Sequence, residues 1–248
     1  MSWAAMGLAG EPGDDGFEVS RLCVVMPALN EADALPAALR CRPDGVRVVV
    51  VDNGSTDGTA EVAIALGAEV ATEPVRGFGA ACRRGVEAAA GADVVVFMDA
   101  DATLDWGDLE AVARPVLEGQ ADLVLGRRVR ALRAPGAMPW HVAVANVMLG
   151  ALCGLLAGAR LHDLGPYRAI RRDALLALGM RDRTYGWPLE MVLRAGRARL
   201  RITEVPTRYL ERVGTSKVTG RWWPTVRTAS RMAAVLARHA FALRRASS

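Results

Sequence analysis

Short apolar segments rich in β-branched residues alternate with helical patterns through the first half of the chain. The apolar segments cover residues 21–27, 46–51, 69–71, 94–98 and 122–128. Helical patterns cover residues 32–40, 59–66, 77–90 and 108–117. Strands that alternate with helices of about ten residues are typical of a parallel sheet covered on both faces. The sequence therefore predicts an α/β fold with a doubly wound, mostly parallel sheet.

The alternation breaks after residue 128, where an almost continuous apolar stretch covers residues 142–159. Its length alone would allow a membrane span, but three glycines and Asn146 interrupt its hydrophobicity. We expect a helix that is buried or lies on a membrane surface. Pro206 should end the last strand or place it at an edge of the sheet. The remaining predicted elements are strands at residues 166–170 and 201–206 and a helix at residues 189–195.

Length, charge and cysteine spacing limit the class of protein. A chain of 248 residues can form one sheet-based domain. The net charge of +4 suits an anionic substrate or a membrane surface, but it is too small to indicate a nucleic-acid partner. The four cysteines lack Cys-x-x-Cys spacing, so we expect buried thiols in a reducing cytosol. These features predict a cytoplasmic protein, either free or peripheral on the cytosolic face of a membrane.

The chain divides into three predicted parts. Residues 1–20 lack the basic start of a signal peptide and are expected to form a flexible leader. Residues 21–220 contain the alternating pattern and form the predicted domain. Residues 221–248 are predicted to form a basic helix, with arginines recurring near one face. That helix is either an ordinary surface helix or, through residues 221–245, a peripheral contact with an anionic bilayer.

Two carboxylates, Asp99 and Asp101, follow the buried strand at residues 94–98, with Ala100 between them. In an open α/β sheet, ligands bind outside the carboxyl ends of the strands. Neighbouring carboxylates repel each other unless a cation neutralises them, and Mg²⁺ and Mn²⁺ prefer oxygen ligands that include substrate phosphates. The pattern predicts a site for a metal and a diphosphate. The alternative is a solvated loop after a core strand.

Other polar residues follow the first two predicted strands. Asn30 is a candidate N-cap for the helix at residues 32–40. Asp52 closes the second strand, where its carboxylate could accept hydrogen bonds from a base or ribose. The alternative is that Asp52 or Asp57 caps the next helix, and Asp57 is the better candidate.

A glycine-containing turn at Arg76 and Gly77 precedes a predicted helix. Glycines let backbone N–H groups approach an anion at a helix N-terminus, so the turn is a candidate phosphate loop. It lacks the spacing of a dinucleotide fingerprint and of a P-loop, and an ordinary turn is the alternative.

Basic residues in the second half could bind phosphate oxygens. Guanidinium groups bind phosphate bidentately, and the alternative for each is a solvated loop. Glu190 is a candidate general base or an ordinary acid in the first turn of a helix. The basic candidates are Arg127, Arg168 and Arg212, followed by Ser216 and Lys217.

Taken together, these motifs resemble glycosyltransferase family 2, and within it the dolichyl-phosphate mannose synthase-like branch. The resemblance covers roughly residues 21–220. The matching motifs occur in the family's order and are MPALNE (26–31), VDNGSTDGT (51–59), RGFG (76–79), DAD (99–101), GR (126–127), DLGPYRA (163–169) and GTSK (214–217).

The resemblance implies a Rossmann-like GT-A fold and the inverting transfer of a sugar from a UDP- or GDP-sugar with Mg²⁺ or Mn²⁺. Asp101 would bind the metal, and Asp99 would touch the ribose or the metal. Asp101 and Arg127 would take part in catalysis, and Arg127 and Arg212 would hold the donor phosphates. Arg212 would contribute to catalysis and, with Arg168, Ser216 and Lys217, to binding an acceptor phosphate. The implied nucleotide-sugar contacts are Pro27, Asn30, Glu31, Asp52, Gly54, Arg76, Gly77, Asp99, Ala100 and Asp101.

The chain departs from the family pattern in two places. Thr103 stands where relatives often carry Gln or another side chain that supports the metal, so the third metal ligand is open. The carboxyl-terminal membrane domain of many relatives is absent, so a polyprenyl-phosphate acceptor is implied without being fixed. The segment YGWPLEM at residues 185–191 is similar to one in soluble members of the branch.

Three alternatives to transfer onto a lipid phosphate stay open. A sugar hydroxyl acceptor would need a base, for which Glu190 is the candidate. A nucleotidyltransferase acting on a sugar phosphate would want a basic, glycine-rich loop after the first strand, where this chain has Pro-Ala-Leu-Asn-Glu. A non-catalytic protein that binds nucleotide sugars is the third alternative.

Overall fold

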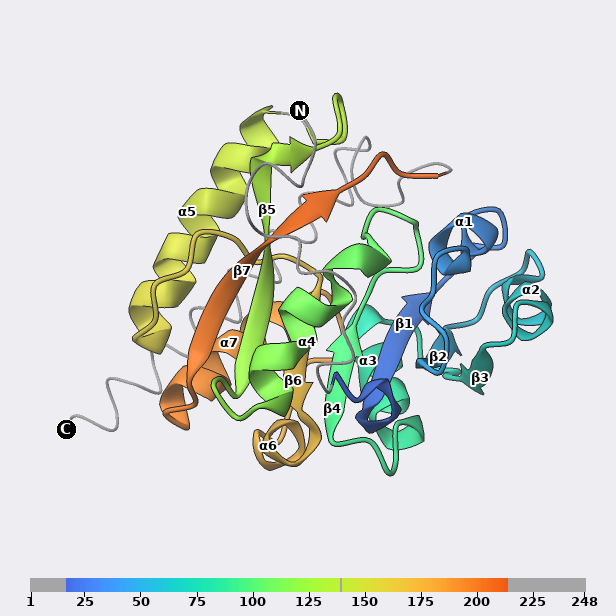
Figure 1. Cartoon of the computed structure of the whole chain (residues 1–248), viewed down its shortest axis with the longest axis horizontal. Helices are drawn as coiled ribbons and strands as arrows, with labels where there is room; N and C mark the ends of the chain where they lie inside the picture. Colours follow the sequence, from blue (N-terminus) through green and yellow to red (C-terminus); the bar gives the residue numbers. More distant parts are fainter. Residues whose placement is uncertain (1–16, 139, 214–248) are drawn as a thin grey trace.

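In the part of the chain that the structure describes, seven strands form the central sheet in the order β3-β2-β1-β4-β6-β5-β7 (Figure 1). The computed structural model describes residues 17–138 and 140–213, so the predicted leader up to residue 16 and the predicted C-terminal helix lie outside the described residues. Only β6 runs antiparallel to its neighbours, β4 and β5. The predicted doubly wound, mostly parallel sheet is therefore confirmed. The strands are β1 (Leu22–Ala28), β2 (Arg47–Asp52), β3 (Glu69–Thr72), β4 (Val94–Phe97), β5 (Leu123–Arg133), β6 (Arg168–Arg171) and β7 (Ile202–Tyr209).

Helices cover both faces of the sheet and bury its apolar strands. Val24 and Val25, adjacent in β1, are fully buried in separate core clusters, because successive strand side chains point to opposite faces. One cluster contains side chains of α1, α2 and α4, and the other contains those of α3, α5, α6 and α7. The helices are α1 (Leu35–Leu39), α2 (Thr59–Ala65), α3 (Phe78–Ala88), α4 (Leu109–Leu117), α5 (Trp140–Ala157), α6 (Arg172–Ala177) and α7 (Trp187–Arg197).

Helix α5 is the long apolar helix predicted after residue 128, and only one of its faces is buried. Gly150 and Gly154 bring this face close to the following loop, since an added Cβ would lie 2.7 Å from the Asp163 nitrogen or 2.5 Å from the Ala159 oxygen. Cys153, between them, is fully buried. The glycines that interrupt the hydrophobic run thus serve close packing. Within the described residues, no helix is long and apolar enough to cross a membrane.

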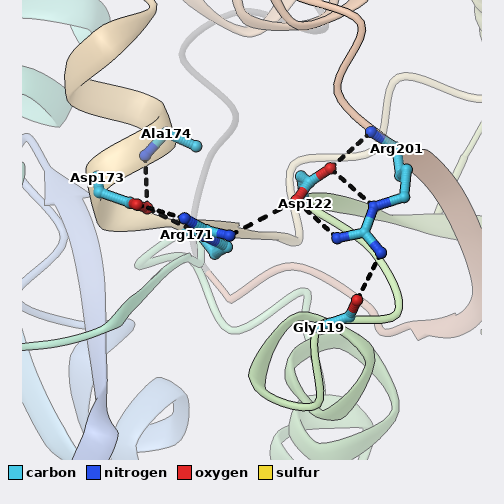
Figure 2. A network of polar contacts seen from close by, with 6 residues as sticks. All are labelled: Gly119, Asp122, Arg171, Asp173, Ala174 and Arg201. Atoms are coloured by element: carbon cyan, nitrogen blue, oxygen red, sulfur yellow. Dashed lines mark hydrogen bonds and ion pairs between the residues drawn. The ribbon is translucent and has the colours of Figure 1, made fainter.

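A cluster of charged residues fixes the start of β5 against the ends of its neighbours (Figure 2). Arg201, just before β7, donates two side-chain hydrogen bonds of 3.0 and 2.9 Å to the Asp122 carboxylate and another to the Gly119 carbonyl. These bonds lower the pKa of Asp122. Arg171, at the end of β6, pairs with Asp173 and reaches within 4.0 Å of Asp122. The cluster ties β5, β6 and β7 together at the edge where β5 begins.

Two local predictions about helix and strand ends differ from the structure. Asn30 does not cap α1, which begins at Leu35 after Ala34; its backbone instead adopts a positive φ of 51°. Strand β7 continues beyond Pro206 to Tyr209, because within the described residues β7 is an edge strand paired only with β5. The proline nitrogen therefore needs no partner on the outer side, and the predicted edge position is confirmed.

Candidate functional site

The carboxyl ends of β1, β2 and β4 form one edge of the sheet, where the chain order reverses around β1. Asp52 ends β2 and pairs with Ala28 at the end of β1. Strand β4 ends at Phe97, opposite Val25, so Asp99 follows two residues later at the same edge. Such a reversal point is the usual ligand-binding position of an open α/β sheet. The topology therefore brings together the ends of the three strands that carry the predicted motifs.

Asp101 meets Arg212 at this edge, although the two residues come from distant parts of the chain. The Arg212 Nη1 donates a 2.8 Å hydrogen bond to Asp101 Oδ2, and its Nη2 donates one of 2.8 Å to Glu31 Oε1. Asp101 is buried, with 8% of its surface exposed. One guanidinium thus joins the segment after β7 to the carboxylates that follow β4 and β1.

Thr103 holds the other oxygen of the Asp101 carboxylate. Its hydroxyl donates a 2.6 Å hydrogen bond and its backbone N–H a 3.1 Å bond to Asp101 Oδ1. The Thr103 carbonyl in turn accepts from the Leu210 N–H, and the Asp101 carbonyl accepts from the Val213 N–H. Thr103 therefore orients the acid directly, although the sequence singled it out only as a departure from the family pattern.

Asp99 has an unusual electrostatic environment. Burial and repulsion from Asp101 raise the pKa of Asp99 to about 7, and Arg128, Arg212 and Arg168 partly offset this rise. Ionising both acids costs free energy because their charges repel each other. A divalent cation bound to them would lower that cost.

The acid pair fits a magnesium or manganese ion that shares its coordination shell with phosphate. Asp99 and Asp101 offer hard carboxylate oxygens, as these ions prefer. Among residues 17–138 and 140–213 there is no group of three or more His, Cys, Asp or Glu that could hold a metal. Mg²⁺ commonly takes its remaining ligands from substrate phosphates and water.

The loops after β1 and β2 are bonded to each other beside the acids. The Asn30 Oδ1 accepts a 2.8 Å hydrogen bond from the Thr56 N–H, and the Asn30 N–H donates to Ser55. Asp52 Oδ1 accepts from the Ser55 N–H, which turns the chain after β2. Asp57 accepts from the Thr59 N–H at the start of α2, but the N-cap position of that helix is Gly58, so Asp57 bonds the first helical residue without being the predicted N-cap. Pro27 is half-buried near the end of β1.

The glycine turn before α3 is occupied by protein groups, contrary to its interpretation as a phosphate loop. The Gly77 N–H donates to Asn53 Oδ1 at 2.7 Å, and the Gly79 N–H donates to the Thr184 carbonyl. A Cβ at Gly77, where φ is +150°, would lie 2.0 Å from the Arg183 oxygen. The glycines therefore allow close approach of the loop before α7, and these two N–H groups already have protein acceptors.

Arg76 and Asn53 hold the same turn from the side of β2. The Arg76 Nη2 donates to the Gly54 carbonyl at 2.8 Å. Asn53 donates to the Glu73 and Val75 carbonyls, and it is buried. Asn53 therefore holds the turn in place through three hydrogen bonds. The sequence did not single out this residue, although it lies inside the VDNGSTDGT segment.

The predicted phosphate-binding arginines differ in their surroundings. Arg127 is half-buried in β5, and its Nε has no hydrogen-bond partner among the described residues. Arg212 touches the acids, as described above. Arg168 is 2% exposed and donates to the Gly165 and Pro188 carbonyls, so the expected contact with an acceptor is not available to it in this conformation. Ser216 and Lys217 lie outside the described residues.

Arg128 is a further cation near the acids that the sequence did not single out. Its guanidinium pairs with Asp163 at 2.7 Å and lies over the Tyr209 ring, 5.3 Å from its centroid. The Arg128 N–H also donates to Asp163. Arg128, directly after the GR motif, is therefore committed to a structural ion pair, whereas Arg127 has none among the described residues.

Glu190 is buried at the start of α7 and uses both carboxylate oxygens for protein contacts. Its Oε2 accepts from the N–H groups of Arg181 and Asp182, at 3.0 and 2.7 Å. Its Oε1 accepts from the Arg194 Nε at 2.6 Å. This arrangement favours the structural alternative over the general base, because both oxygens are held by protein donors and only 4% of the surface of Glu190 is exposed.

Comparison with known proteins agrees with this geometry. Residues 23–179 match the model of Glycosyl transferase family 2. An uncharacterized glycosyltransferase of Mycobacterium tuberculosis is 44% identical over 200 residues, covering 79% of this chain and 89% of the relative. The undecaprenyl-phosphate mannosyltransferase of Micrococcus luteus is 34% identical over 222 residues, covering 81% and 88%.

A solved structure shares the architecture. Glucosyl-3-phosphoglycerate synthase from Mycobacterium tuberculosis, in complex with Mn²⁺, UDP-glucose and phosphoglyceric acid, superimposes with a TM-score of 0.71 at 25% identity. The match covers 93% of this chain and 85% of that protein. The predicted GT-A fold is confirmed by this similarity.

Proposed function

Because the chain belongs to glycosyl transferase family 2, we propose that it transfers a sugar, with inversion, from a UDP- or GDP-sugar to a lipid phosphate. The observation that carries the proposal is the Asp99–Asp101 pair at the reversal point of the sheet, with Arg212 bonded to the second acid. A carboxylate pair beside a fixed guanidinium suits a ligand that brings both a divalent cation and phosphates.

The donor would lie across the ends of β1, β2 and β4. In this proposal Pro27, Asn30, Glu31, Asp52 and Gly54 hold the base and ribose. Asp99 and Asp101 hold Mg²⁺ or Mn²⁺, which when bound neutralises charge on the diphosphate. Arg127 and Arg212 add positive charge beside the same phosphates. Arg76, Gly77 and Ala100 are further proposed contacts of the donor. The Gly77 N–H already donates to Asn53, so the donor would have to contact other atoms of this turn.

The chemical step follows from the charges of the reactants. An acceptor oxygen attacks the anomeric carbon, the bond from that carbon to the diphosphate oxygen breaks, and the diphosphate leaves with the electron pair. A phosphate acceptor is already anionic at neutral pH and needs no general base. This agrees with the position of Glu190, which is buried and bonded to protein donors through both of its oxygens.

The choice of a lipid-phosphate acceptor is supported by the relative described as an undecaprenyl-phosphate mannosyltransferase, which matches most of this chain. The solved relative was crystallised with phosphoglyceric acid, which is also a phosphate. A phosphate-bearing acceptor is therefore the class to test first. A panel should contain polyprenyl phosphates, small phosphorylated acids and neutral sugars.

The direct test is release of nucleoside diphosphate by the purified chain. UDP-sugars and GDP-mannose are offered with Mn²⁺, with each acceptor in turn, and the Asp101→Ala variant serves as comparison. We expect transfer to a phosphate acceptor and its loss in Asp101→Ala. Unchanged turnover in that variant would contradict the proposed metal-dependent site, and transfer only to neutral sugars would contradict the acceptor.

A further inference from the structure

The outward face of α5 is unusually apolar for a surface helix. It consists of Trp140, Val144, Val147, Met148, Leu152 and Leu155, all of which are exposed. Trp140, Met148 and Leu155 have 79%, 68% and 80% of their surface accessible. A surface helix normally carries charged residues on this side, yet α5 contains no Lys, Arg, Asp or Glu. A contiguous apolar stripe of this kind marks an interaction surface.

The opposite face of α5 fixes which side is presented outward. Gly150 and Gly154 pack against the loop at residues 158–163, and Ala157 meets Gly196 of α7, where an added Cβ would lie 2.5 Å away. These close contacts leave no room for larger side chains, so the helix cannot turn its apolar side inward. The stripe is a fixed feature of the fold, and its helix, α5, runs along the outer side of the domain (Figure 1).

Charge around α5 identifies the partner. From residue 123 to residue 162 the chain contains five arginines and no aspartate or glutamate, although one of the five, Arg128, is paired with Asp163. Arg130, near the end of β5, and Arg160, just after α5, are both exposed. We propose that the α5 stripe docks on the surface of an anionic lipid bilayer, with its apolar side chains in the interface and Arg130 and Arg160 at the headgroups.

Two other occupants fit the charges less well. The C-terminal segment, residues 214–248, contains seven Lys and Arg and no Asp or Glu, so it would be repelled by the arginines that flank α5. A second copy of the chain would bring the same arginines to the same face. An anionic bilayer offers both the apolar interior and the negative charge.

The inference goes beyond the proposed reaction, because docking requires neither donor nor acceptor. In the fold, α5 begins where β5 ends, and β5 ends at the same side of the sheet as the acid pair. A docked α5 would therefore hold the candidate site next to the membrane surface. A chain that does not bind vesicles would contradict the docking proposal and not the proposed reaction. A chain that binds vesicles without transferring a sugar would contradict the reaction and not the docking.

The test is co-sedimentation of the full chain with vesicles of phosphatidylcholine, alone or with roughly a third phosphatidylglycerol. We expect binding to the mixed vesicles that weakens with added salt. The double variant Met148→Glu/Leu155→Glu should bind about tenfold less or weaker still, because two charges enter the apolar interface. Ile64→Glu, which changes an exposed apolar residue of α2, is the matched control and should bind like the unchanged chain.

Two readouts separate the alternatives. Trp140→Phe should remove much of the fluorescence blue shift seen on adding mixed vesicles, since Trp140 is at the docking face. Melting temperatures check that the variants fold. Equal vesicle binding by Met148→Glu/Leu155→Glu and the unchanged chain would overturn the proposal. A dimer in solution that this double variant disperses would also overturn it, in favour of a second copy as the occupant.

Discussion

Arg212 donates a hydrogen bond of 2.8 Å to Asp101 across 111 residues of sequence. The same guanidinium also reaches Glu31, so it joins the segment after β7 to the ends of β4 and β1. A fixed cation beside paired acids neutralises part of their charge before any ligand arrives. In the proposed reaction the same guanidinium would lie next to the departing diphosphate.

Arg212→Gln should therefore lower kcat for sugar transfer by a factor on the order of 10². The physical reason is the loss of a preorganised positive charge beside the leaving group. Arg212→Lys should retain part of the rate, since it keeps the charge without the forked geometry. Initial rates at saturating donor and Mn²⁺ measure both.

Arg201→Gln is the control for this experiment. Arg201 binds Asp122 at the edge where β5 begins (Figure 2), whereas the acids follow the end of β4, at the opposite edge. Its loss should lower the melting temperature and leave kcat unchanged. An Arg212→Gln enzyme with normal kcat would remove Arg212 from the proposed mechanism.

Thr103→Val should weaken Mn²⁺ activation while preserving the fold. The variant removes the hydroxyl that donates a 2.6 Å hydrogen bond to Asp101 Oδ1 and keeps the side-chain shape. We expect a loss of about 1 kcal/mol in orienting the acid, which corresponds to a roughly fivefold higher Mn²⁺ requirement. Thr103→Ser keeps the hydroxyl and should behave like the unchanged enzyme. Equal Mn²⁺ requirements in all three proteins would show that Thr103 does not position Asp101.

Stability of the metal-free protein should fall as pH rises through the range in which Asp99 titrates. Its pKa is raised to about 7, above its ordinary value near 3.8, so the folded state keeps a proton that the unfolded state has lost. Between these two values the folded state binds more protons, and the free energy of unfolding decreases with increasing pH. Urea unfolding from about pH 4.5 to pH 8, in the presence of chelator, measures the slope.

Asp99→Asn removes this titration and should flatten that part of the stability curve. Above pH 7 the variant should be more stable than the unchanged protein without metal, because no charge is forced into the buried position. A curve that keeps the same slope in Asp99→Asn would assign the pH dependence to another group.

Glu190→Gln tests whether this residue is structural or a base. Its carboxylate joins the 181–182 backbone to Arg194, so we expect the variant to lose about 1–3 kcal/mol of unfolding free energy and to retain activity at low temperature. Chemical denaturation and rate assays on the same preparation measure both quantities. A variant with normal stability and no transfer would restore the general-base interpretation and a hydroxyl acceptor.

The sequence predicted the parallel core because its strands are continuous apolar runs separated by helices. It could not predict that β6 is antiparallel, since the segment Arg-Ala-Ile-Arg at residues 168–171 carries no mark of direction. Helix α6 escaped prediction because its six residues are too few for a helical period to emerge. The burial of only one face of α5 was also hidden, because both faces are equally apolar.

Within the candidate site, local motifs predicted which strand ends carry the acids. The contact between Arg212 and Asp101 needed the whole fold, because strand order decides which distant segments meet. Gly77 shows the limit of motif reasoning. Glycine permits close approach of an anion or of another backbone, and here the neighbour is the Arg183 carbonyl. Sequence spacing alone does not distinguish these two neighbours.

Isothermal titration of UDP and GDP, each with and without Mn²⁺, tests directly whether the acid pair binds the metal. The unchanged chain is compared with Asp101→Asn. We expect Mn²⁺ to tighten the binding of at least one nucleotide to the unchanged chain by about tenfold or more. Asp101→Asn, whose melting curve checks that it is folded, should lose this dependence on Mn²⁺. Equal Mn²⁺ dependence in the two proteins would contradict the claim that the acid pair binds the metal.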